Sequence, residues 1–473
     1  MEIKNYLAVD LGATSGRTIV ASYDGSKVTM RELTRFKNPI IPTGGHLFWD
    51  LPGLYNEILT ALRKVVEEGI KIESIGIDTW GVDVAFFGKD GQLLSLPYCY
   101  RDSHTEGAID RYMKMHEKKE VYDRTGIQFM EFNTLFQLDT LRHNGCTAYE
   151  NADKILFTPD ALIYMLTGKA ICEYTIASTS QMLNPNTGDL DHDLLKSIGL
   201  SREHFGPMTQ PGTVIGPLSE QVQKATGMGP EVKVVAIAAH DTASAVAAVP
   251  AKDANYAYLS CGTWSLMGIE SPTPIINEES YRQNFTNEGG IEGTTRFLKN
   301  ICGLWIFEQS RKEFKDVPSE IGALSALCEQ SDFDSRINPD DPSFAHPESM
   351  TKAIDEYLEK TGQILPKTPA DYIRCIYKSL AFRYKAIIGI LEEFSPNPIE
   401  CLHVIGGGAL NKYLMQYTAD AIERPVICGP IEGTALGNVL MQIKSQGLVK
   451  TLPEMREIVA NSVELTVYNP TNK

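Results

Sequence analysis

The segment KNYLAVDLGATSGRTIVA, residues 4–21, decides the fold. It begins with an apolar run through Val9, reaches Asp10, passes through a turn of small and polar residues and resumes as the apolar run 18–21. This order predicts a strand, a tight turn and a second strand. Small residues let backbone N–H groups approach a phosphate, and Asp10 suits a metal ion that bridges such phosphates. The alternative is a plain hairpin with an incidental acid.

A second segment of the same kind opens the second half of the chain. The apolar run 256–260 leads into Cys261-Gly262-Thr263 and then into the run 264–269. Two strand–turn–strand units roughly 250 residues apart predict a duplicated architecture rather than a short repeat. Two such hairpins, facing each other across a cleft, would hold the phosphates of one nucleoside triphosphate from both sides. The meander excludes a dinucleotide-binding start, and no Gly-Lys-Ser/Thr marks a P-loop.

Helices and strands are predicted along the rest of the chain. The first half predicts strands at 27–30, 72–77, 84–87 and 232–237, helices at 50–68, 160–167 and 243–249, and a helical stretch over roughly 103–144. The second half predicts strands at 400–405 and 425–428 and helices at 297–314, 370–394 and from Lys412 onward. With 473 residues the chain is too long for one core, and Pro250 marks a boundary. We therefore expect an α/β protein with domains 1–250 and 251–473.

Composition and charge limit the partners. The net charge of −16 argues against nucleic acid or an anionic membrane as the main partner, because both select basic surfaces. No uninterrupted run of 18 apolar residues exists, and polar residues near the start leave no signal-peptide core. The nine cysteines are scattered without metal-ligand spacing, which favours a reducing, cytoplasmic compartment. We expect a monomer or a weak homodimer.

Two strand ends carry residues suited to chemistry on a sugar. Asp241 lies between the predicted strand 232–237 and a small-residue helix, whose N-terminus favours an ionised carboxylate that can act as general base. A simple helix cap is the alternative. Asp78-Thr79-Trp80-Gly81-Val82-Asp83 sets hydrogen-bonding groups beside an indole, as a sugar site requires, although Trp80 could equally pack in the core.

Three successive glycines, Gly406, Gly407 and Gly408, lie between a predicted strand and a predicted helix. Without side chains, the backbone here can lie against a flat ring such as adenine, or against its sugar. A loose linker is the alternative, but the flanking elements argue against it.

Taken together, these motifs resemble the FGGY carbohydrate kinases, whose two ribonuclease H-like domains belong to the actin-like ATPase superfamily and enclose a central cleft. The resemblance covers nearly the whole chain and rests on segments 10–17, 44–50, 76–83, 100–102, 240–245, 260–266, 284–290, 299–305, 406–408 and 429–430. The stretches Asp78–Asp83 and Asn287–Gly290 are specific, whereas the hairpins alone indicate only the superfamily. Within the family, the chain most resembles members that phosphorylate the 1-hydroxyl of L-rhamnulose.

The resemblance implies ATP and Mg²⁺ as cofactors, a small ketose as substrate and roles for particular residues. Asp241 is implied as the catalytic base, and Asp10 as the acid on the metal side, acting through water. The implied sugar-binding residues are Asp78, Trp80, Gly81, His240, Asp241 and Thr242. The implied nucleotide- and phosphate-binding residues are Ala13, Thr14, Ser15, Gly16, Arg17, Thr263, Asn300, Glu308, Gly406, Gly407 and Gly408.

The sequence departs from the family pattern at two places. Glu308 stands where a glutamine is expected among the nucleotide contacts, and the usual Lys–apolar–x–Trp signature is absent near Thr158-Pro159-Asp160. A kinase for another ketose or polyol, such as L-fuculose or L-xylulose, therefore stays open, as does a non-enzymatic actin-like nucleotide-binding protein. The latter has no need of a base beside a sugar site.

Overall fold

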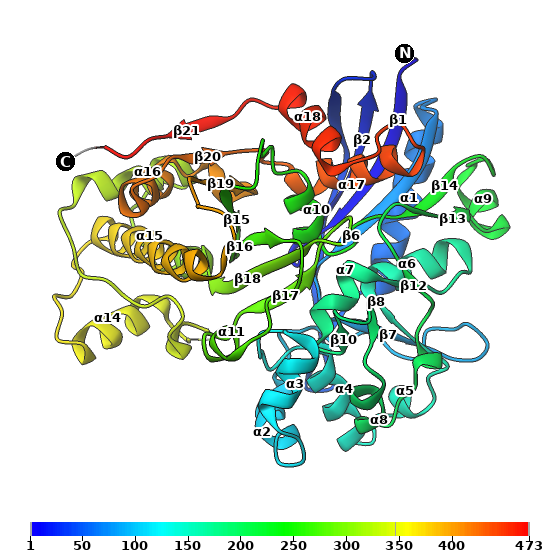
Figure 1. Cartoon of the computed structure of the whole chain (residues 1–473), viewed down its shortest axis with the longest axis horizontal. Coiled ribbons are helices and arrows are strands. Elements are labelled where there is room, and N and C mark those ends of the chain that lie inside the picture. The colour runs from blue at the N-terminus through cyan, green and yellow to red at the C-terminus, as the bar shows by residue number, and fades with distance from the viewer. Residues whose placement is uncertain (1, 346, 472–473) are drawn as a thin grey trace. The chain divides into compact units, whose positions relative to one another are not determined.

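The computed structural model describes residues 2–345 and 347–471, which form two compact units (Figure 1). The first unit takes the chain up to Pro250 together with Ser271–Phe297 and Thr434–Ser462. The second takes Ala251–Glu270, Leu298–Gly433 and the chain from Val463. The first segment thus ends at Pro250, where the sequence indicated a division, and two later segments pack with the same unit.

The first unit contains most of the short elements. Its strands are β1 (Lys4–Leu11), β2 (Ser15–Tyr23), β3 (Val28–Lys37), β4 (Ile40–Thr43), β5 (His46–Trp49), β6 (Ile72–Thr79), β7 (Val84–Phe87), β8 (Lys154–Phe157), β9 (Cys172–Glu173), β10 (Leu183–Asn184), β11 (Asp189–Leu190), β12 (Met208–Thr209), β13 (Thr213–Pro217), β14 (Lys233–Ala236) and β17 (Thr286–Gly289). Its helices are α1 (Leu51–Glu67), α2 (Ala108–Tyr112), α3 (Lys118–Thr125), α4 (Thr134–His143), α5 (Thr147–Glu150), α6 (Thr158–Thr167), α7 (Tyr174–Ala177), α8 (His192–Ser197), α9 (Glu220–Thr226), α10 (Asp241–Ala247), α11 (Glu278–Arg282), α17 (Gly433–Ser445) and α18 (Leu452–Ser462).

Six strands of this unit form one sheet in the order β13-β14-β6-β1-β2-β3. β1 pairs antiparallel with β2, and β2 with β3, which confirms the predicted opening meander. β6 runs parallel to β1, and β14 runs parallel to β6. The C-terminal ends of β1, β6 and β14 therefore meet at one edge of the sheet.

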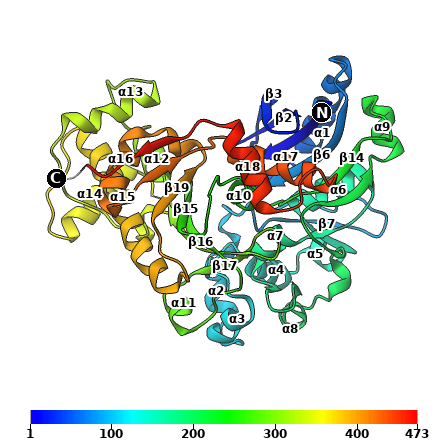
Figure 2. The ribbon, with the colours of Figure 1, turned by 45° about the horizontal axis from the view of Figure 1, so that its top comes forward.

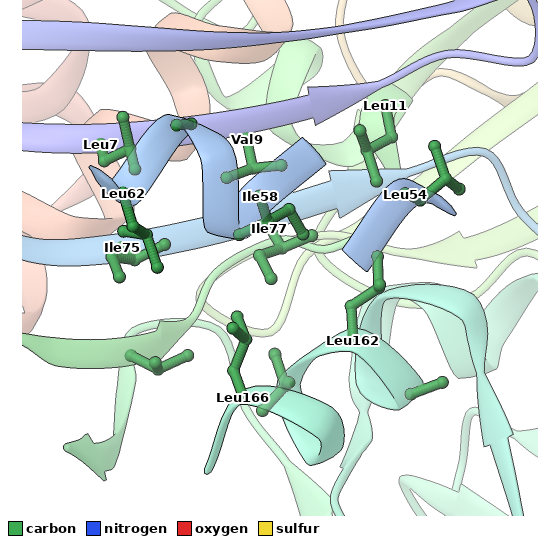
Figure 3. Packing of buried hydrophobic residues seen from close by; sticks show 14 of the residues in the cluster. Leu7, Val9, Leu11, Leu54, Ile58, Leu62, Ile75, Ile77, Leu162 and Leu166 are labelled. Atoms are coloured by element: carbon green, nitrogen blue, oxygen red, sulfur yellow. The ribbon is translucent and has the colours of Figure 1, made fainter. Parts of the chain in front are cut away.

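One face of this sheet packs on α1 and α6 (Figure 3). Successive side chains of a strand point to opposite faces, so alternate residues of β1 and β6 form the apolar layer. Asp50 caps α1 by accepting a hydrogen bond from Gly53 N at 2.9 Å, close to where the sequence predicted this helix to begin. The buried residues of this layer include Leu7, Val9, Leu11, Leu54, Ile58, Leu62, Ile75, Ile77, Leu162 and Leu166.

The opposite face carries the polar residues of the same strands, and α10, α17 and α18 gather on it (Figure 2). Ser74 Oγ donates a hydrogen bond to Gln442 Oε1 of α17 at 2.7 Å. Gly76 is needed where α17 crosses β6, because an added Cβ would lie 2.4 Å from Asn438 Oδ1. Asp10 and Asp78 lie on this polar face, because side chains alternate along a strand and the adjacent leucines, valines and isoleucines point to the core.

The second unit repeats the same plan. Its strands are β15 (Tyr256–Cys261), β16 (Trp264–Ser271), β18 (Thr295–Cys302), β19 (Cys401–Ile405), β20 (Val426–Cys428) and β21 (Thr466–Tyr468), and the chain passes between the units within β16 and β18. Its helices are α12 (Trp305–Ser310), α13 (Ile321–Ala326), α14 (Met350–Lys360), α15 (Pro369–Phe394) and α16 (Lys412–Ile422); α15 and α16 lie side by side (Figure 1).

The second sheet has seven strands in the order β17-β18-β16-β15-β19-β20-β21, and its strands from β21 to β18 follow the same order as the six strands of the first sheet, with β17 as an additional edge strand. An antiparallel hairpin is followed by two parallel strands and an antiparallel edge strand in both sheets. The predicted duplicated α/β architecture is confirmed.

One predicted helix is wrong. Residues 297–314 were predicted as one helix, but Thr295–Cys302 forms strand β18 and only Trp305–Ser310 is α-helical. The predicted helical stretch 103–144 consists of several short helices, because Gly107 and Gly126 take left-handed conformations with φ of 72° and 65° that interrupt the helical path.

Candidate active site

Three carboxylates lie at the C-terminal ends of three adjacent parallel strands of the first unit: Asp10 within β1, Asp78 within β6, and Asp241 after β14. Asp10 and Asp78 are direct neighbours in the register of β1 and β6. Thr79 pairs with His240 in an isolated parallel bridge, which brings the segment before Asp241 beside the end of β6. The structure therefore gathers Asp10, Asp78 and Asp241, which lie far apart in the sequence, at one edge of one sheet.

Asp10 is held by the hairpin that follows it. Arg17, its partner in the β1–β2 register, donates from Nε and Nη2 to Asp10 Oδ2 at 2.9 and 2.7 Å. Gly12 N donates to Ser15 O at 2.9 Å and closes the turn. Gly16 leaves no room for a side chain, because an added Cβ would lie 2.3 Å from the Phe36 ring. The predicted phosphate-binding residues 13–17 thus span the end of this turn and the first residues of β2, with Thr14 exposed.

Asp78 is fully buried, at 0% exposure. Asn438 Nδ2 of α17 donates to Asp78 Oδ2 at 2.6 Å, while Asp78 Oδ1 has no hydrogen-bond partner among the described residues. Burial, and then the neighbouring charge of Asp10, raise the pKa of Asp78 well above its usual value. Asn438 lies 360 residues from Asp78 in the chain, and sequence reasoning missed it.

The unpartnered oxygen of Asp78, beside Asp10, fits a hard divalent cation, since carboxylate oxygens are the ligands that such ions prefer. Within residues 2–345 and 347–471, no group of three or more His, Cys, Asp or Glu side chains could hold a metal ion directly. The two carboxylates could therefore supply only part of a coordination shell, with water or phosphate oxygens as the remaining ligands.

Asp241 is the first residue of α10, and its side chain is 35% exposed. Thr242 donates to Asp241 Oδ1 from its backbone N at 2.5 Å and from Oγ1 at 3.1 Å. Burial raises the pKa of Asp241 above its usual value, and the charge of Asp10 adds to that shift. The carboxylate is thus oriented by its neighbour yet open enough to reach a ligand.

His240 lies against a buried ion pair. Glu288 of β17 and Arg296 of β18 are 5% and 1% exposed, with Glu288 Oε2 and Arg296 Nη1 3.1 Å apart. His240 Nδ1 lies 3.2 Å from Arg296 Nη2, and His240 Nε2 lies 3.4 Å from Asp241 Oδ1. Burial alone would raise the pKa of Glu288, but the charge of Arg296 holds it below its usual value. Sequence reasoning assigned no role to Glu288 or Arg296.

The backbone before Asp241 is held by α7. Glu173 Oε2 accepts a hydrogen bond from Ala239 N at 3.2 Å, and Thr175 Oγ1 accepts one from His240 N at 3.2 Å. Glu173 is fully buried beside Asp160, and burial raises its pKa to about 7. Sequence reasoning missed this support as well, because no local pattern links residues 173 and 239.

Trp80 belongs to the core of the first unit and is 5% exposed. Asp83 Oδ2 accepts hydrogen bonds from Trp49 Nε1 at 2.6 Å and from Trp80 Nε1 at 2.9 Å. The two indole rings pack with centroids 4.2 Å apart. Asp83 therefore fixes the orientation of both rings, and the contact of Trp80 with a sugar stays a prediction.

Gly81 and Val82 form a strained turn between Trp80 and Asp83. Val82 has a φ of 68°, which is rare for a β-branched residue, and Asp83 N donates to Gly81 O at 2.9 Å across it. Val82 N donates to Thr179 Oγ1 at 3.0 Å. An added Cβ on Gly81 would lie 3.1 Å from the Thr179 side chain, so the turn leaves little space for a larger residue.

The second unit contains the other predicted nucleotide-binding residues. Thr263 is exposed in the β15–β16 turn, where Gly262 N donates to Trp264 O at 2.9 Å, and Trp305 N donates to Thr263 O at 3.1 Å. Asn300 lies on β18, in the same sheet. Glu308 of α12 forms an ion pair with Arg311 at 2.7 Å, so its carboxylate already has a cationic partner.

The triple glycine follows β19 in the same unit. An added Cβ would lie 3.1 Å from Cys261 O at Gly406, which has a φ of 86°, and 2.3 Å from Cys261 Sγ at Gly408. At Gly407 it would meet no described atom within 4 Å. Gly406 and Gly408 are therefore needed for packing against β15, whereas Gly407 leaves open backbone where a flat ring could lie.

Comparisons with known proteins agree with this architecture. The model of the N-terminal domain of the FGGY family of carbohydrate kinases matches residues 5–248, and that of the C-terminal domain matches residues 257–445. A rhamnulokinase from Bacteroides thetaiotaomicron is 52% identical over 468 residues, covering 99% of this chain and 96% of that protein. A rhamnulokinase from Pectobacterium carotovorum is 41% identical over 99% of this chain and 94% of its own length.

The fold also matches solved structures. The crystal structure of gluconate kinase from Lactobacillus acidophilus superposes with a TM-score of 0.83 at 17% identity, covering 99% of this chain and 94% of that one. The family models together span most of the sequence and both units. The chain belongs to the FGGY family of carbohydrate kinases.

Proposed function

We propose that this chain transfers the γ-phosphoryl group of ATP to the 1-hydroxyl of L-rhamnulose, giving L-rhamnulose 1-phosphate and ADP in L-rhamnose catabolism. The observation that carries this proposal is the 52% identity to a rhamnulokinase over 99% of the chain. The cluster of Asp10, Asp78 and Asp241 at one sheet edge supports it, because it offers both a proton acceptor and carboxylates for a cation.

Asp241 is the proposed general base. Its oriented, partly exposed carboxylate accepts the proton of the 1-hydroxyl while the new oxygen–phosphorus bond forms and the bond to the ADP oxygen breaks. Because the transition state of phosphoryl transfer is loose, Asp241 mainly aligns the hydroxyl and takes its proton late. The pKa raised by burial increases the affinity of this carboxylate for that proton.

The sugar is proposed to bind in the first unit, beside the ends of β6 and β14. His240 and Thr242 supply hydrogen-bonding groups next to Asp241, and Gly81 keeps the neighbouring turn narrow. Trp80 and Asp78 are the remaining proposed sugar-site residues; both are buried, so they act on the shape and polarity of this region.

Nucleotide contacts are proposed in each unit by itself: the hairpin turn after Asp10 in the first, and the hairpin turn at Thr263 with the triple glycine in the second. The proposed phosphate contacts are Ala13, Thr14, Ser15, Gly16, Arg17 and Thr263, and the proposed nucleoside contacts are Asn300, Glu308, Gly406, Gly407 and Gly408. Asp10 would hold Mg²⁺ through water, with Asp78 as a neighbouring acceptor. When bound, such a cation neutralises phosphate charge. Glu308 is the weakest of these assignments, because Arg311 already occupies its carboxylate.

The location and assembly of the protein are also proposals. Within residues 2–345 and 347–471 no helix is long and apolar enough to cross a membrane. All nine cysteines are free thiols, which supports the reducing environment of the cytoplasm. We propose a monomer or a weak homodimer with no nucleic-acid partner, consistent with the net charge of −16.

A ketose panel tests the substrate. ADP release is measured by a coupled assay with L-rhamnulose, L-fuculose, L-xylulose and D-xylulose at equal concentrations, with and without Mg²⁺. The proposal expects the highest kcat/KM for L-rhamnulose and a requirement for the cation. A higher kcat/KM for another ketose or a polyol would show that the chain is a carbohydrate kinase with a different substrate. Absence of turnover on every sugar, with nucleotide still bound, would favour the non-enzymatic actin-like alternative.

A further inference from the structure

The Glu288–Arg296 ion pair also contacts the imidazole of His240. The pair is buried beside the imidazole of His240, with Arg296 Nη2 3.2 Å and Glu288 Oε2 3.3 Å from His240 Nδ1. Arg296 Nε donates to Gly289 O at 2.9 Å and fixes the plane of the guanidinium. Buried ion pairs cost desolvation and are weak evidence for stability alone. Because this pair contacts the His240 ring directly, it is placed to orient that ring.

The contact with Arg296 decides which ring nitrogen carries the proton. Glu288 Oε2 lies 3.3 Å from His240 Nδ1 but has no hydrogen-bond partner among the described residues, so only the Arg296 contact has the geometry of a hydrogen bond. A guanidinium can only donate hydrogen bonds, so the Arg296 contact requires an unprotonated Nδ1 with a free lone pair. A neutral imidazole with an acceptor at Nδ1 carries its proton at Nε2. That nitrogen faces Asp241 Oδ1 at 3.4 Å. Thr242 donates to the same oxygen, so Asp241 Oδ1 is approached by donors from both of its chain neighbours.

We infer that Glu288 and Arg296 are positioning residues that keep His240 as the neutral Nε2–H tautomer and thereby hold the Asp241 carboxylate in one orientation. Arg296 donates a hydrogen bond to the Nδ1 lone pair. Glu288 neutralises the charge of Arg296, so that no net positive charge is buried next to the ring. Neither residue touches the reacting atoms in this scheme. The inference rests on the proposed role of Asp241, but its structural part concerns a tautomer and does not depend on the identity of the sugar.

The tautomer can be measured directly. Protein labelled with ¹⁵N at its nine histidines gives ring-nitrogen resonances, and the His240 pair is assigned by its loss in His240→Gln. The expected result in the wild type is a protonated Nε2 and an unprotonated Nδ1. A protonated Nδ1, whether in the other tautomer or in an imidazolium, would overturn the inference. This measurement needs only the folded wild-type protein and the assignment variant.

Kinetics test the functional part. Glu288→Gln keeps the shape of the side chain and removes its charge, and Arg296→Lys keeps a donor while losing the planar fork. We expect Glu288→Gln to lower kcat by roughly ten- to a hundredfold, by analogy with the loss seen when the partners that orient metal-ligating histidines are removed, with KM changed much less. Arg296→Lys should retain more activity than Arg296→Met, because lysine can still donate to Nδ1.

Asp139→Asn is the matched control. Asp139 accepts from Arg111 Nε and Nη2 at 3.1 Å in the same unit and contacts none of the site residues. The control should keep kcat while losing a comparable ion pair. A folded Glu288→Gln with wild-type kcat, or a control that loses as much kcat, would contradict the positioning role. The expected tautomer without turnover of any ketose would instead count against the proposed function.

Discussion

Gly407 and Gly408 are neighbours with different surroundings. Gly408 is needed for packing, whereas Gly407 is proposed to contact nucleotide. Gly407→Ala adds a Cβ into space that no described atom occupies, so folding stability should stay unchanged while KM for ATP rises. Gly408→Ala forces a Cβ to within 2.3 Å of Cys261 Sγ and should cost on the order of 1–3 kcal/mol of stability. Thermal unfolding and ATP titrations of both variants measure the two effects.

An unchanged KM for ATP in Gly407→Ala would contradict the proposed contact between Gly407 and nucleotide. If Gly407→Ala binds ATP as the wild type does, the open backbone at this position serves another purpose. A Gly408→Ala protein as stable as the wild type would show that Cys261 can move away at little cost.

Glu173 predicts a pH dependence of stability. Its folded-state pKa of about 7 lies above the usual value of 4.5, because the side chain is buried. The stabilisation is fully present below pH 4.5 and is lost as the pH rises through about 7, which corresponds to about 3 kcal/mol. Urea unfolding at pH 5 and pH 8 should show lower stability at pH 8, and Glu173→Gln should flatten that difference.

Glu320→Gln is the control for this prediction. Glu320 caps α13 through Gly322 N and Ala323 N, as Glu173 caps α7, but it is exposed. Hydrogen bonds from these two amides lower its pKa, so it titrates below the range compared. The Glu320 variant should therefore keep the wild-type difference between pH 5 and pH 8; an equal flattening in both variants would contradict the assignment to Glu173.

At the scale of elements, α17 supports the carboxylates through a polar face. Asn438 is buried and donates to Asp78 Oδ2 and Gly76 O, whereas Gln446, two turns later, accepts from Tyr6 OH nearer the surface. Asn438→Ala should cost about 1–3 kcal/mol because it leaves buried acceptors unpaired, and Gln446→Ala should cost less. Equal losses of urea midpoint would show that α17 acts only as a packing element.

The sequence predicted elements well where a local pattern exists. The opening hairpin, α1 and α15 have caps or periodic apolar residues, and the structure confirms each. Strand β18 was predicted as part of a helix because its apolar residues continue into those of α12 with helical spacing. Its pairing in the sheet decides otherwise, and that partner cannot be recognised from residues 295–302 alone.

Some residues of the candidate site could also be predicted from local sequence patterns, and others could not. Asp10, Asp78 and Asp241 could be found from the sequence because each follows an apolar strand, and parallel strands end at one edge. Glu288 lies in the specific stretch Asn287–Gly290, but that motif did not indicate its contact with His240. Asn438, Glu173 and Arg296 could not be assigned a role, because each reaches the site across tens to hundreds of residues. Their signal lies in tertiary packing and leaves no local periodicity.

At the scale of the whole molecule, two sheets of the same strand order are proposed to bind different ligands. Hydrogen exchange should separate them. L-rhamnulose alone should slow exchange in segments 78–82 and 239–242 of the first unit. A non-hydrolysable ATP analogue with Mg²⁺ should slow exchange at 262–263 and 406–408 of the second unit and at 12–17 of the first.

Protection of the triple glycine by the sugar, or of segment 239–242 by nucleotide alone, would contradict this division. The matched control is an L-sugar that the enzyme does not phosphorylate, which should leave both sets of segments unchanged.

The central claim is that Asp241 accepts the proton of the sugar hydroxyl, and steady-state kinetics of Asp241→Asn test it most directly. Asp193→Asn, at an exposed acid in the first turn of α8, serves as control. With L-rhamnulose and saturating ATP, kcat of Asp241→Asn should fall about a hundredfold or more, while the control keeps wild-type kcat. A folded Asp241→Asn protein that turns over L-rhamnulose at the wild-type rate would contradict the account.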